Sequence, residues 1–266
     1  MIKRFLWSAK KSTELTMIQS DESQLQSKEN LTKSLYLQHA PGKLGHLLQY
    51  ITKSNFAQPK RYKAHFLKKM VPETGTVLDV GCGNSSPWWT KTLLPNIYYV
   101  GIDIGDYNQT APNLADEYVI SSPDDFSESI SLMGQRFDAV ISSANLEHCD
   151  HRQKTLEAMV SVIKPGGVLY LTFPTEKSVS FPGPRWGCLN YYDDGTHKGE
   201  PPNYKETIEF LQKDMEIVYG SKSYKPFFFY VVGFFNESTS NKYKTVMQGT
   251  WEYWGLLSVI WAKKKE

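Results

Sequence analysis

The sequence predicts an α/β fold, in which a doubly wound and mostly parallel sheet is covered by helices on both faces. From residue 77 onward, short apolar runs alternate with segments of helical periodicity, and the first run ends in a glycine-containing turn. This order of elements is typical of a parallel sheet with crossover helices. The chain has 266 residues, 40% of them hydrophobic, which is enough for one substantial core. We therefore expect one main domain with additions.

The expected elements follow the chain in order. The expected strands are Val77–Val80, Tyr98–Ile102, Glu117–Ile120, Phe137–Ser142 and Val168–Phe173. The expected helices are Trp88–Leu94, Asp125–Leu132, Arg152–Ile163 and a last one near Tyr204–Lys213. Two further apolar segments, Phe227–Phe235 and Leu256–Ala262, are expected to complete the sheet.

The composition divides the chain into an extension, a cap and the main domain. Residues 1–33 are polar and predict a flexible or helical N-terminal arm, and residues 34–72 carry apolar residues at helical spacing, which predicts a helical cap. The main domain is expected at 73–266. Within it, residues 174–202 are rich in Pro, Gly, Asp and aromatics without a period. A connection of that length predicts a functional insertion after strand five, on the acceptor side.

Charge and cysteine content exclude several functional classes. The chain has 30 Lys and Arg against 28 Asp and Glu, and no long basic face, so we expect no nucleic-acid partner. Three cysteines without a CxxC pair argue against a disulfide framework and fit a reducing cytoplasm. The longest uncharged apolar run, 226–235, is far shorter than the roughly 20 residues of a spanning helix, so no integral membrane segment is expected.

The segment 77–87 predicts a ligand-binding loop. An apolar strand, a turn with Gly81 and Gly83, and a helix start bring bare backbone to the carboxyl end of the strand, with Ser86 as the expected N-cap and Pro87 as the first helical residue. A dinucleotide loop would need a third glycine where Ser86 stands, which disfavours an oxidoreductase. Asp103 ends the next apolar strand, where a carboxylate can accept both hydroxyls of an adenosine ribose.

Five segments together resemble the class I S-adenosylmethionine-dependent methyltransferase family over about residues 75 to 175. They are Val77–Gly83, Gly101–Asp103, Phe137–Val140, Leu146–His148 and Ile163–Gly167. The resemblance implies a Rossmann-like sheet of seven strands with an antiparallel last strand, for which Leu256–Ala262 is the candidate. It also implies S-adenosylmethionine as the cofactor. The loop departs from the commonest family form at Asn84–Ser85, where another glycine often follows.

The resemblance also implies a set of cofactor-binding residues. Asp79, Gly81 and Gly83 are expected to line the methionine and ribose, Asp103 to hold the ribose hydroxyls, and Asp124 or Asp125 to lie near the adenine amino group. The neighbouring residues Cys82, Ile104 and Ser143 complete the predicted set. The alternative is a strand–helix connection without a ligand, in which the two strand-end aspartates are merely solvated.

The acceptor is expected above the end of the fourth strand, at Ser142–His148. Methyl transfer from a sulfonium is an in-line displacement that needs positioning and, for a hydroxyl acceptor, removal of a proton. The segment lacks the Asn or Asp, two prolines and aromatic residue usual in methyltransferases of base amines, which favours oxygen or carbon as the acceptor atom. His148 is either a general base or a structural cap of the strand, and these alternatives stay open.

A second candidate base lies in the insertion. His197 follows the adjacent carboxylates Asp193 and Asp194, and this group could activate a sugar hydroxyl or form an ordinary turn. It could also hold a divalent ion, but the remaining ligands cannot be identified, so no metal site is predicted. Asp150, between His148 and His151, is better explained as the N-cap of the next helix than as part of a metal cluster.

A second resemblance concerns the acceptor. Leu189–His197 and Gly249–Gly255 resemble bacterial methyltransferases of cell-surface polysaccharide clusters. This implies O-methylation of a small molecule, sugar or polysaccharide in polysaccharide biosynthesis. A quinone or lipid-like acceptor and a non-catalytic cofactor-binding module are the alternatives, and the oligomeric state stays open.

Overall fold

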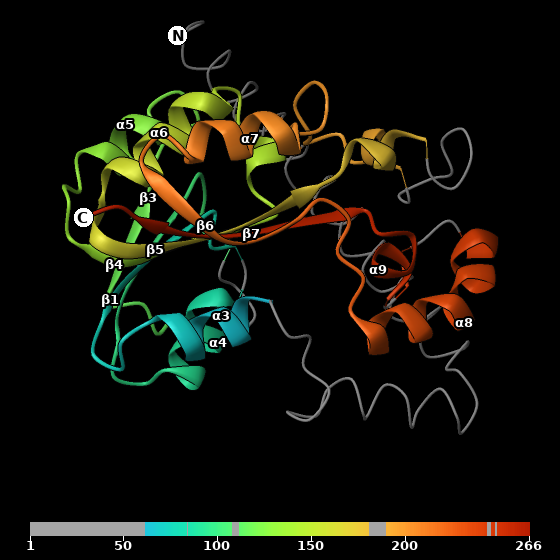
Figure 1. Cartoon of the computed structure of the whole chain (residues 1–266), viewed down its shortest axis with the longest axis horizontal. Helices are drawn as coiled ribbons and strands as arrows, with labels where there is room; N and C mark the ends of the chain where they lie inside the picture. Colours follow the sequence, from blue (N-terminus) through green and yellow to red (C-terminus); the bar gives the residue numbers. More distant parts are fainter. Residues whose placement is uncertain (1–61, 84, 108–111, 181–189, 244–245, 248) are drawn as a thin grey trace, which may run out of the picture. The chain divides into compact units, whose positions relative to one another are not determined.

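The computed structural model describes the chain within residues 62–266 except 84, 108–111, 181–189, 244–245 and 248, and in this part it has an α/β fold (Figure 1). The predicted N-terminal arm and residues 34–61 of the predicted cap lie outside the described residues. No helix in the described part is long and apolar enough to cross a membrane.

The sheet has seven strands among the described residues, in the order β3-β2-β1-β4-β5-β7-β6. They are β1 Thr76–Val80, β2 Tyr98–Asp103, β3 Glu117–Ile120, β4 Phe137–Ser143, β5 Ile163–Pro174, β6 Met215–Ser221 and β7 Leu257–Lys264. β1 to β5 pair in parallel, whereas β7 runs antiparallel to both β5 and β6. The predicted seven-stranded Rossmann-like sheet with an antiparallel last strand is confirmed.

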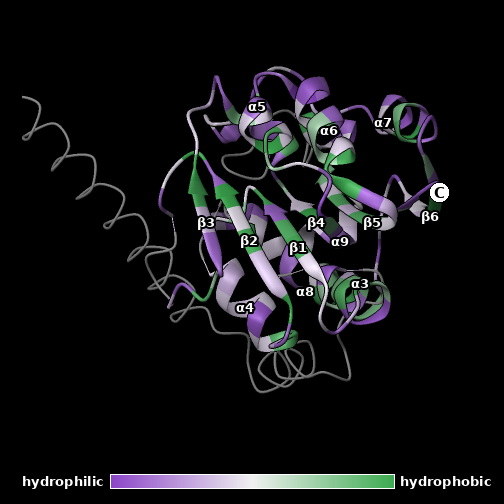
Figure 2. Cartoon of the chain, turned by 90° about the vertical axis from the view of Figure 1, so that its left-hand side faces the viewer, coloured by the Kyte–Doolittle hydropathy of each residue, from purple (hydrophilic) through white to green (hydrophobic). Residues whose placement is uncertain are grey.

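Helices cover both faces of the sheet. The helices are α3 Lys63–Met70, α4 Ser86–Leu93, α5 Phe126–Ser131, α6 Arg152–Ser161, α7 Tyr204–Leu211, α8 Phe227–Tyr243 and α9 Thr250–Trp254, with 3-10 turns η1 Leu146–His148, η2 Glu176–Val179 and η4 Tyr191–Asp193. α5, α6 and α7 pack on one face and α3 and α4 on the other (Figure 1). In Figure 2 these helices alternate between hydrophilic and hydrophobic segments, as expected of helices with one face on a sheet.

The central strands divide the core into two layers. Along β1, Leu78 and Val80 belong to the cluster under α5 to α7, and Val77 belongs to the cluster under α3 and α4. Successive side chains of a strand point to opposite faces, so a strand covered on both sides must be apolar throughout. This explains why residues 77–80 of β1 are all apolar except Asp79.

The prediction that Phe227–Phe235 forms a strand of the sheet is wrong. This run begins the 17-residue helix α8, and the sixth strand is Met215–Ser221. A short apolar run fits a helix as well as a strand, and here packing decides, because Gly233 of α8 lies directly against the backbone of Gly249 before α9. β6 is an edge strand whose residues alternate between more and less buried, a pattern that its sequence carries only weakly.

Two predicted helix starts also differ. Ser86 is the first residue of α4 and its hydroxyl donates to Asp79 Oδ2, so the residue before the helix is Ser85, which is left-handed at φ 68°. α6 follows His151 without a side-chain cap, and the predicted cap Asp150 instead pairs with Lys198 at 3.4 Å. In both cases a tertiary partner competes with the local cap.

Candidate active site

A cavity of about 600 Å³ opens at the carboxyl ends of β1, β2 and β4. The chain goes from β1 outward to β2 and β3, then returns to β4 on the other side, so the strand order reverses between β1 and β4. Open α/β sheets bind ligands at such a reversal. The lining of the cavity includes one wall of Gly81, Gly83, Asp103 and Ile104, from the ends of β1 and β2, and a second wall with His148 and Thr196, from η1 and the segment after η4.

The two glycines of the loop serve different purposes. Gly81 has φ +70°, and a Cβ there would lie 2.3 Å from Asn145 Oδ1, so this glycine lets the loop pack against the end of β4. Gly83 has φ +54°, and a Cβ there would meet nothing within 4 Å among the residues that the structure describes. Its bare backbone therefore faces the open cavity. Both positive φ values favour glycine over any other residue.

Asp103 is a buried carboxylate on the cavity wall. The backbone N–H of Gly83 donates to its Oδ2 at 2.7 Å, and the N–H of Ile104 donates to its Oδ1 at 2.8 Å. Burial raises the pKa of this carboxyl, and the two N–H donors oppose the rise. Each oxygen keeps a lone pair for a further donor, so the pair fits two adjacent ribose hydroxyls. The cavity's size and this carboxylate fit an adenosyl cofactor.

The other predicted cofactor residues do not all reach this cavity. Asp79 is buried and accepts from Tyr99 Oη at 2.8 Å and from Ser86 Oγ at 2.5 Å, while Lys63 Nζ lies 3.5 Å away. Among the described residues, the cavity lining does not include Asp79, Cys82, Asp124, Asp125 or Ser143. Asp124 lines a separate surface depression. The roles predicted for these five residues stay predictions.

The two histidines that the sequence offered as alternative bases lie next to each other in the structure. The ring of His148, at the end of η1, lies 4.8 Å from the ring of His197, which follows η4. His197 also stacks on Tyr191 at 4.2 Å. Of the two histidines, His148 is the one that lines the cavity, and His197 lies behind it. The two therefore belong to one cluster, with Asp194 Oδ2 3.8 Å from His197 Nε2.

Hydrogen bonds fix the orientation of both rings. Thr196 Oγ1 donates to Asp194 Oδ1 at 2.6 Å and lies 2.9 Å from His148 Nδ1. Because the single hydroxyl proton is used on Asp194, His148 Nδ1 must be the donor in the second contact. His197 Nδ1 lies 2.6 Å from the carbonyl of Tyr191, which can only accept. In the neutral form of each ring, the Nε2 atom is therefore left with its lone pair.

Glu147 belongs to the same cluster, although the sequence placed it only in a family segment and not among the predicted site residues. Its side chain is 1% exposed, and its Oε2 has no hydrogen-bond partner in the described part of the chain. Burial raises the pKa of this carboxyl to about 8. The glutamate next to His148 was visible in the sequence, but only the fold shows that it is buried beside a second histidine.

Arg152, another residue that sequence reasoning missed, holds the two segments of the cluster together. Its guanidinium donates to the carbonyl oxygens of Leu146, Glu147, Lys198 and Glu200 and to the Tyr191 hydroxyl. It thereby ties η1 to residues 191–200, which lie almost 50 residues further along the chain. A backbone bond from Lys198 N to Glu147 O at 2.8 Å adds to this link. These contacts bring His197 to His148.

Comparison with known proteins identifies the family. A family model of the methyltransferase domain matches residues 42–210, more than half of the chain. The chain belongs to the methyltransferase domain family. This confirms the predicted class I methyltransferase and its cofactor, S-adenosylmethionine.

Curated relatives of this methyltransferase domain have diverse acceptors. The chain is 24% identical over 208 residues to an Arabidopsis thaliana tRNA (carboxymethyluridine(34)-5-O)-methyltransferase, which covers 76% of this chain and 49% of the relative. It is 27% identical over 112 residues to the mitochondrial ubiquinone biosynthesis O-methyltransferase of Mus musculus, covering 40% of this chain and 30% of the relative. The chain thus spans about half or less of the length of these relatives.

Solved structures share the fold of this methyltransferase domain. A chain of the Haloferax volcanii complex with the methyltransferase activator Trm112 aligns with a TM-score of 0.53 at 15% identity, over 83% of this chain and 95% of that one. An S-adenosylmethionine-dependent methyltransferase of Mesorhizobium loti aligns with a TM-score of 0.51 at 15% identity, over 74% and 95% of the two chains. At these identities the likeness concerns the fold alone.

Proposed function

We propose that the protein transfers the methyl group of S-adenosylmethionine to a hydroxyl oxygen of a small molecule, with a sugar or polysaccharide unit as the acceptor. The observation that carries this proposal is the single cavity with two unlike walls. Asp103 and the glycine loop form the cofactor wall, and His148 and Thr196 form the acceptor wall. A methyl donor and an acceptor held in one cavity can meet in line, which supplies much of the catalytic effect.

The chain's own residues position the reactants and receive the hydroxyl proton. S-adenosylmethionine, when bound, supplies an activated methyl group on a sulfonium. Asp103 holds the ribose, and Gly83 leaves room for the cofactor to approach the backbone. Of the proposed catalytic residues, His148 reaches the cavity, so we place the acceptor oxygen beside it. His197 and Asp194 act through His148 and are positioning residues.

The acceptor wall supports a hydroxylated acceptor over a wholly apolar one. Besides His148 and Thr196, the cavity is lined there by Asp150 and Lys198. Such groups offer hydrogen bonds to several hydroxyls, whereas a sterol or quinone ring would displace water from them without replacing its hydrogen bonds. Two curated relatives are named as O-methyltransferases, which agrees with an oxygen acceptor. The near-neutral net charge of +2 favours a small acceptor over a nucleic acid. A cytoplasmic location stays a prediction.

Two measurements test the proposal in sequence. In a thermal-shift assay, S-adenosylmethionine and S-adenosylhomocysteine are expected to raise the melting temperature, and NADH is expected to leave it unchanged. Transfer from S-adenosylmethionine with a labelled methyl group is then measured on nucleotide sugars, oligosaccharides, a hydroquinone, a sterol and tRNA. Label on a sugar hydroxyl is the expected result. Label only on the hydroquinone, sterol or tRNA, or cofactor binding without any transfer, would overturn the proposed acceptor.

A further inference from the structure

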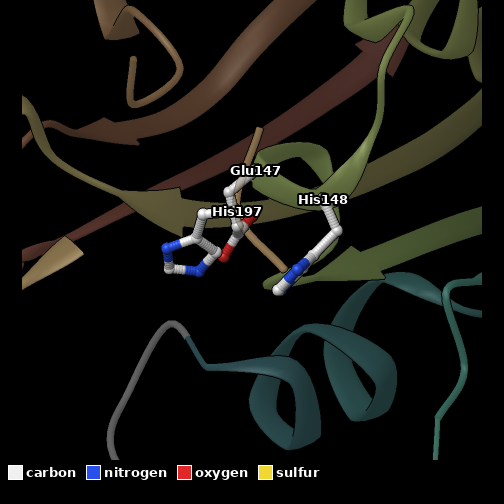
Figure 3. Close-up of side chains that lie close together, drawn as sticks. All are labelled: Glu147, His148 and His197. Carbon is white, nitrogen blue, oxygen red and sulfur yellow. The ribbon is translucent and has the colours of Figure 1, made fainter. Parts of the chain in front are cut away.

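Three potential metal ligands converge beside the cavity. Glu147 and His148 come from η1, and His197 comes from the segment after η4, yet one ligand atom of each lies within 4.8 Å of the other two. Figure 3 shows the Glu147 carboxylate between the two imidazole rings. Two distant parts of the chain thus present a carboxylate and two imidazoles to one small space.

One oxygen of the Glu147 carboxyl group, Oε2, is buried without a hydrogen-bond partner in the described part of the chain. The nearby cation, Arg152, directs its N–H groups to carbonyl oxygens and a tyrosine hydroxyl, and none of its bonds goes to this carboxylate. A buried carboxylate is stable only if it is protonated, paired or bound to a metal. A bound cation would satisfy the unpartnered oxygen.

Both imidazoles are held in the form that binds metals. The Nδ1 atoms of His148 and His197 are engaged by Thr196 Oγ1 and the Tyr191 carbonyl, which leaves each Nε2 with a lone pair. Metal-binding histidines almost always donate their other N–H to a carboxylate, a backbone carbonyl or a water molecule, and here a carbonyl and a hydroxyl take that place. The Asp194 carboxylate behind Thr196 completes the outer layer around His148.

We infer that Glu147, His148 and His197 form a binding site for one divalent transition-metal ion of the Zn²⁺ type, at the acceptor wall of the cavity. Two imidazoles and one carboxylate suit zinc-like ions better than Mg²⁺ or Ca²⁺, which prefer all-oxygen sites. Three protein ligands leave one position open, as in catalytic zinc sites. Zinc bonds of about 2.0–2.1 Å place tetrahedral ligands roughly 3.3 Å apart, so ligand atoms that lie up to 4.8 Å apart must approach one another by up to about 1.5 Å on binding.

This site deepens the proposed function and rests on it for its chemical consequence. His148 lines the cavity, so the open coordination position lies next to the acceptor. With the ion bound, His148 Nε2 coordinates it and no longer receives the proton, so an acceptor hydroxyl at the open position loses its proton to solvent water, because a divalent ion stabilises the oxyanion. The oxygen then forms the new C–O bond as the methyl–sulfonium bond breaks, and S-adenosylhomocysteine leaves with the sulfur electron pair. Metal binding itself needs neither cofactor nor acceptor.

Calorimetry with the full chain tests the site without relying on activity. EDTA-treated protein is titrated with ZnCl₂ and, separately, with MgCl₂. We expect about one Zn²⁺ per chain and much weaker Mg²⁺ binding. Glu147→Gln and His197→Gln should each weaken Zn²⁺ binding by more than the roughly 10–100-fold that loss of an outer-layer partner costs. The matched control is Glu157→Gln, which changes an exposed glutamate of α6 and should bind Zn²⁺ as the wild type does.

A spectroscopic measurement removes the dependence on variants that fail to fold. Co²⁺ added to the wild-type protein should give the intense visible absorption of a four-coordinate site, and Zn²⁺ should displace it. No specific Zn²⁺ binding by the wild type, or equal binding by wild type and Glu147→Gln, would overturn the inference. Methyl transfer that continues in EDTA would then leave the proposed function standing. Zn²⁺ binding by a protein that S-adenosylmethionine does not stabilise would support the metal site and overturn the proposed function.

Discussion

The cofactor wall and the acceptor wall of the cavity are built from the chain in different ways. The cofactor wall comes from short contiguous segments at the ends of β1 and β2. The backbone conformation of the glycine loop and the carboxylate of Asp103 form most of its binding surface. The acceptor wall joins η1 to residues 191–200, across almost 50 residues of chain. The cofactor wall is therefore the part that a local motif can specify, whereas the acceptor wall depends on long-range contacts such as those of Arg152.

The largest expected effect concerns the acceptor wall. His148→Gln removes the imidazole that lines the cavity and should lower kcat by about 100- to 10,000-fold, the usual contribution of a group that handles the acceptor proton. The affinity for S-adenosylmethionine, measured by calorimetry, should stay within about twofold. An equal loss of cofactor affinity would show that the two walls do not act separately.

A substitution in the cofactor wall should lower the affinity for S-adenosylmethionine more than it lowers kcat. Asp103→Ala removes the acceptor of two expected ribose hydrogen bonds and should weaken S-adenosylmethionine binding by at least about 100-fold, because bonds to charged groups contribute about 1.5–3 kcal/mol each. At saturating cofactor, kcat should fall far less than in His148→Gln. Unchanged cofactor affinity in a folded variant would place the ribose elsewhere.

The two loop glycines allow a comparison within the cofactor wall. Gly81→Ala should destabilise the protein by about 2–3 kcal/mol, because its Cβ would overlap Asn145 at a positive φ. Gly83→Ala should cost only about 1 kcal/mol, from φ alone, yet weaken cofactor binding because its methyl group enters the cavity. Chemical denaturation and cofactor titration of both variants separate the effects. Equal stability losses would contradict the assigned roles.

A smaller effect is expected at the support of the acceptor wall. Thr196→Val keeps the volume of the side chain but breaks the link between Asp194 and His148, so kcat should fall by about 10-fold. S-adenosylmethionine affinity should not change. Thr196→Ser, which keeps the hydroxyl, should restore most of kcat, and a Ser variant as slow as the Val variant would argue against the hydrogen bond.

The smallest effect is expected away from both walls. Burial alone would raise the pKa of Asp138, but the Lys164 ammonium and the Thr76 N–H bind its carboxylate and lower the pKa below the ordinary 3.8. Because the folded-state pKa is the lower one, this stabilisation is present above about pH 4 and is lost as the pH falls through the folded-state value. Asp138→Asn should cost less than about 1 kcal/mol at pH 7, and the difference should vanish in strong acid. Denaturation at pH 7 and pH 2.5 measures it, with cofactor affinity unchanged.

The order of strands and helices up to residue 175 follows from the sequence. Strands buried on both faces must be apolar throughout, so β1, β2, β4 and β5 stand out in the chain. After residue 202 this signal weakens. β6 is a half-exposed edge strand, and the apolar run of α8 fits either element, so packing of α8 against α9 decides its conformation.

The sequence by itself determined the family, the cofactor and the carboxylate at the end of β2, because these depend on short motifs with fixed local geometry. It also selected His148 and His197, but as separate alternatives. Only the tertiary structure joined them to one another and to Glu147, since the contacts of Arg152 and the fold of η1 and η4 bridge a long stretch of chain. The physical reason is that burial and mutual distance belong to the packed chain, whereas residue type and spacing are all that a sequence displays.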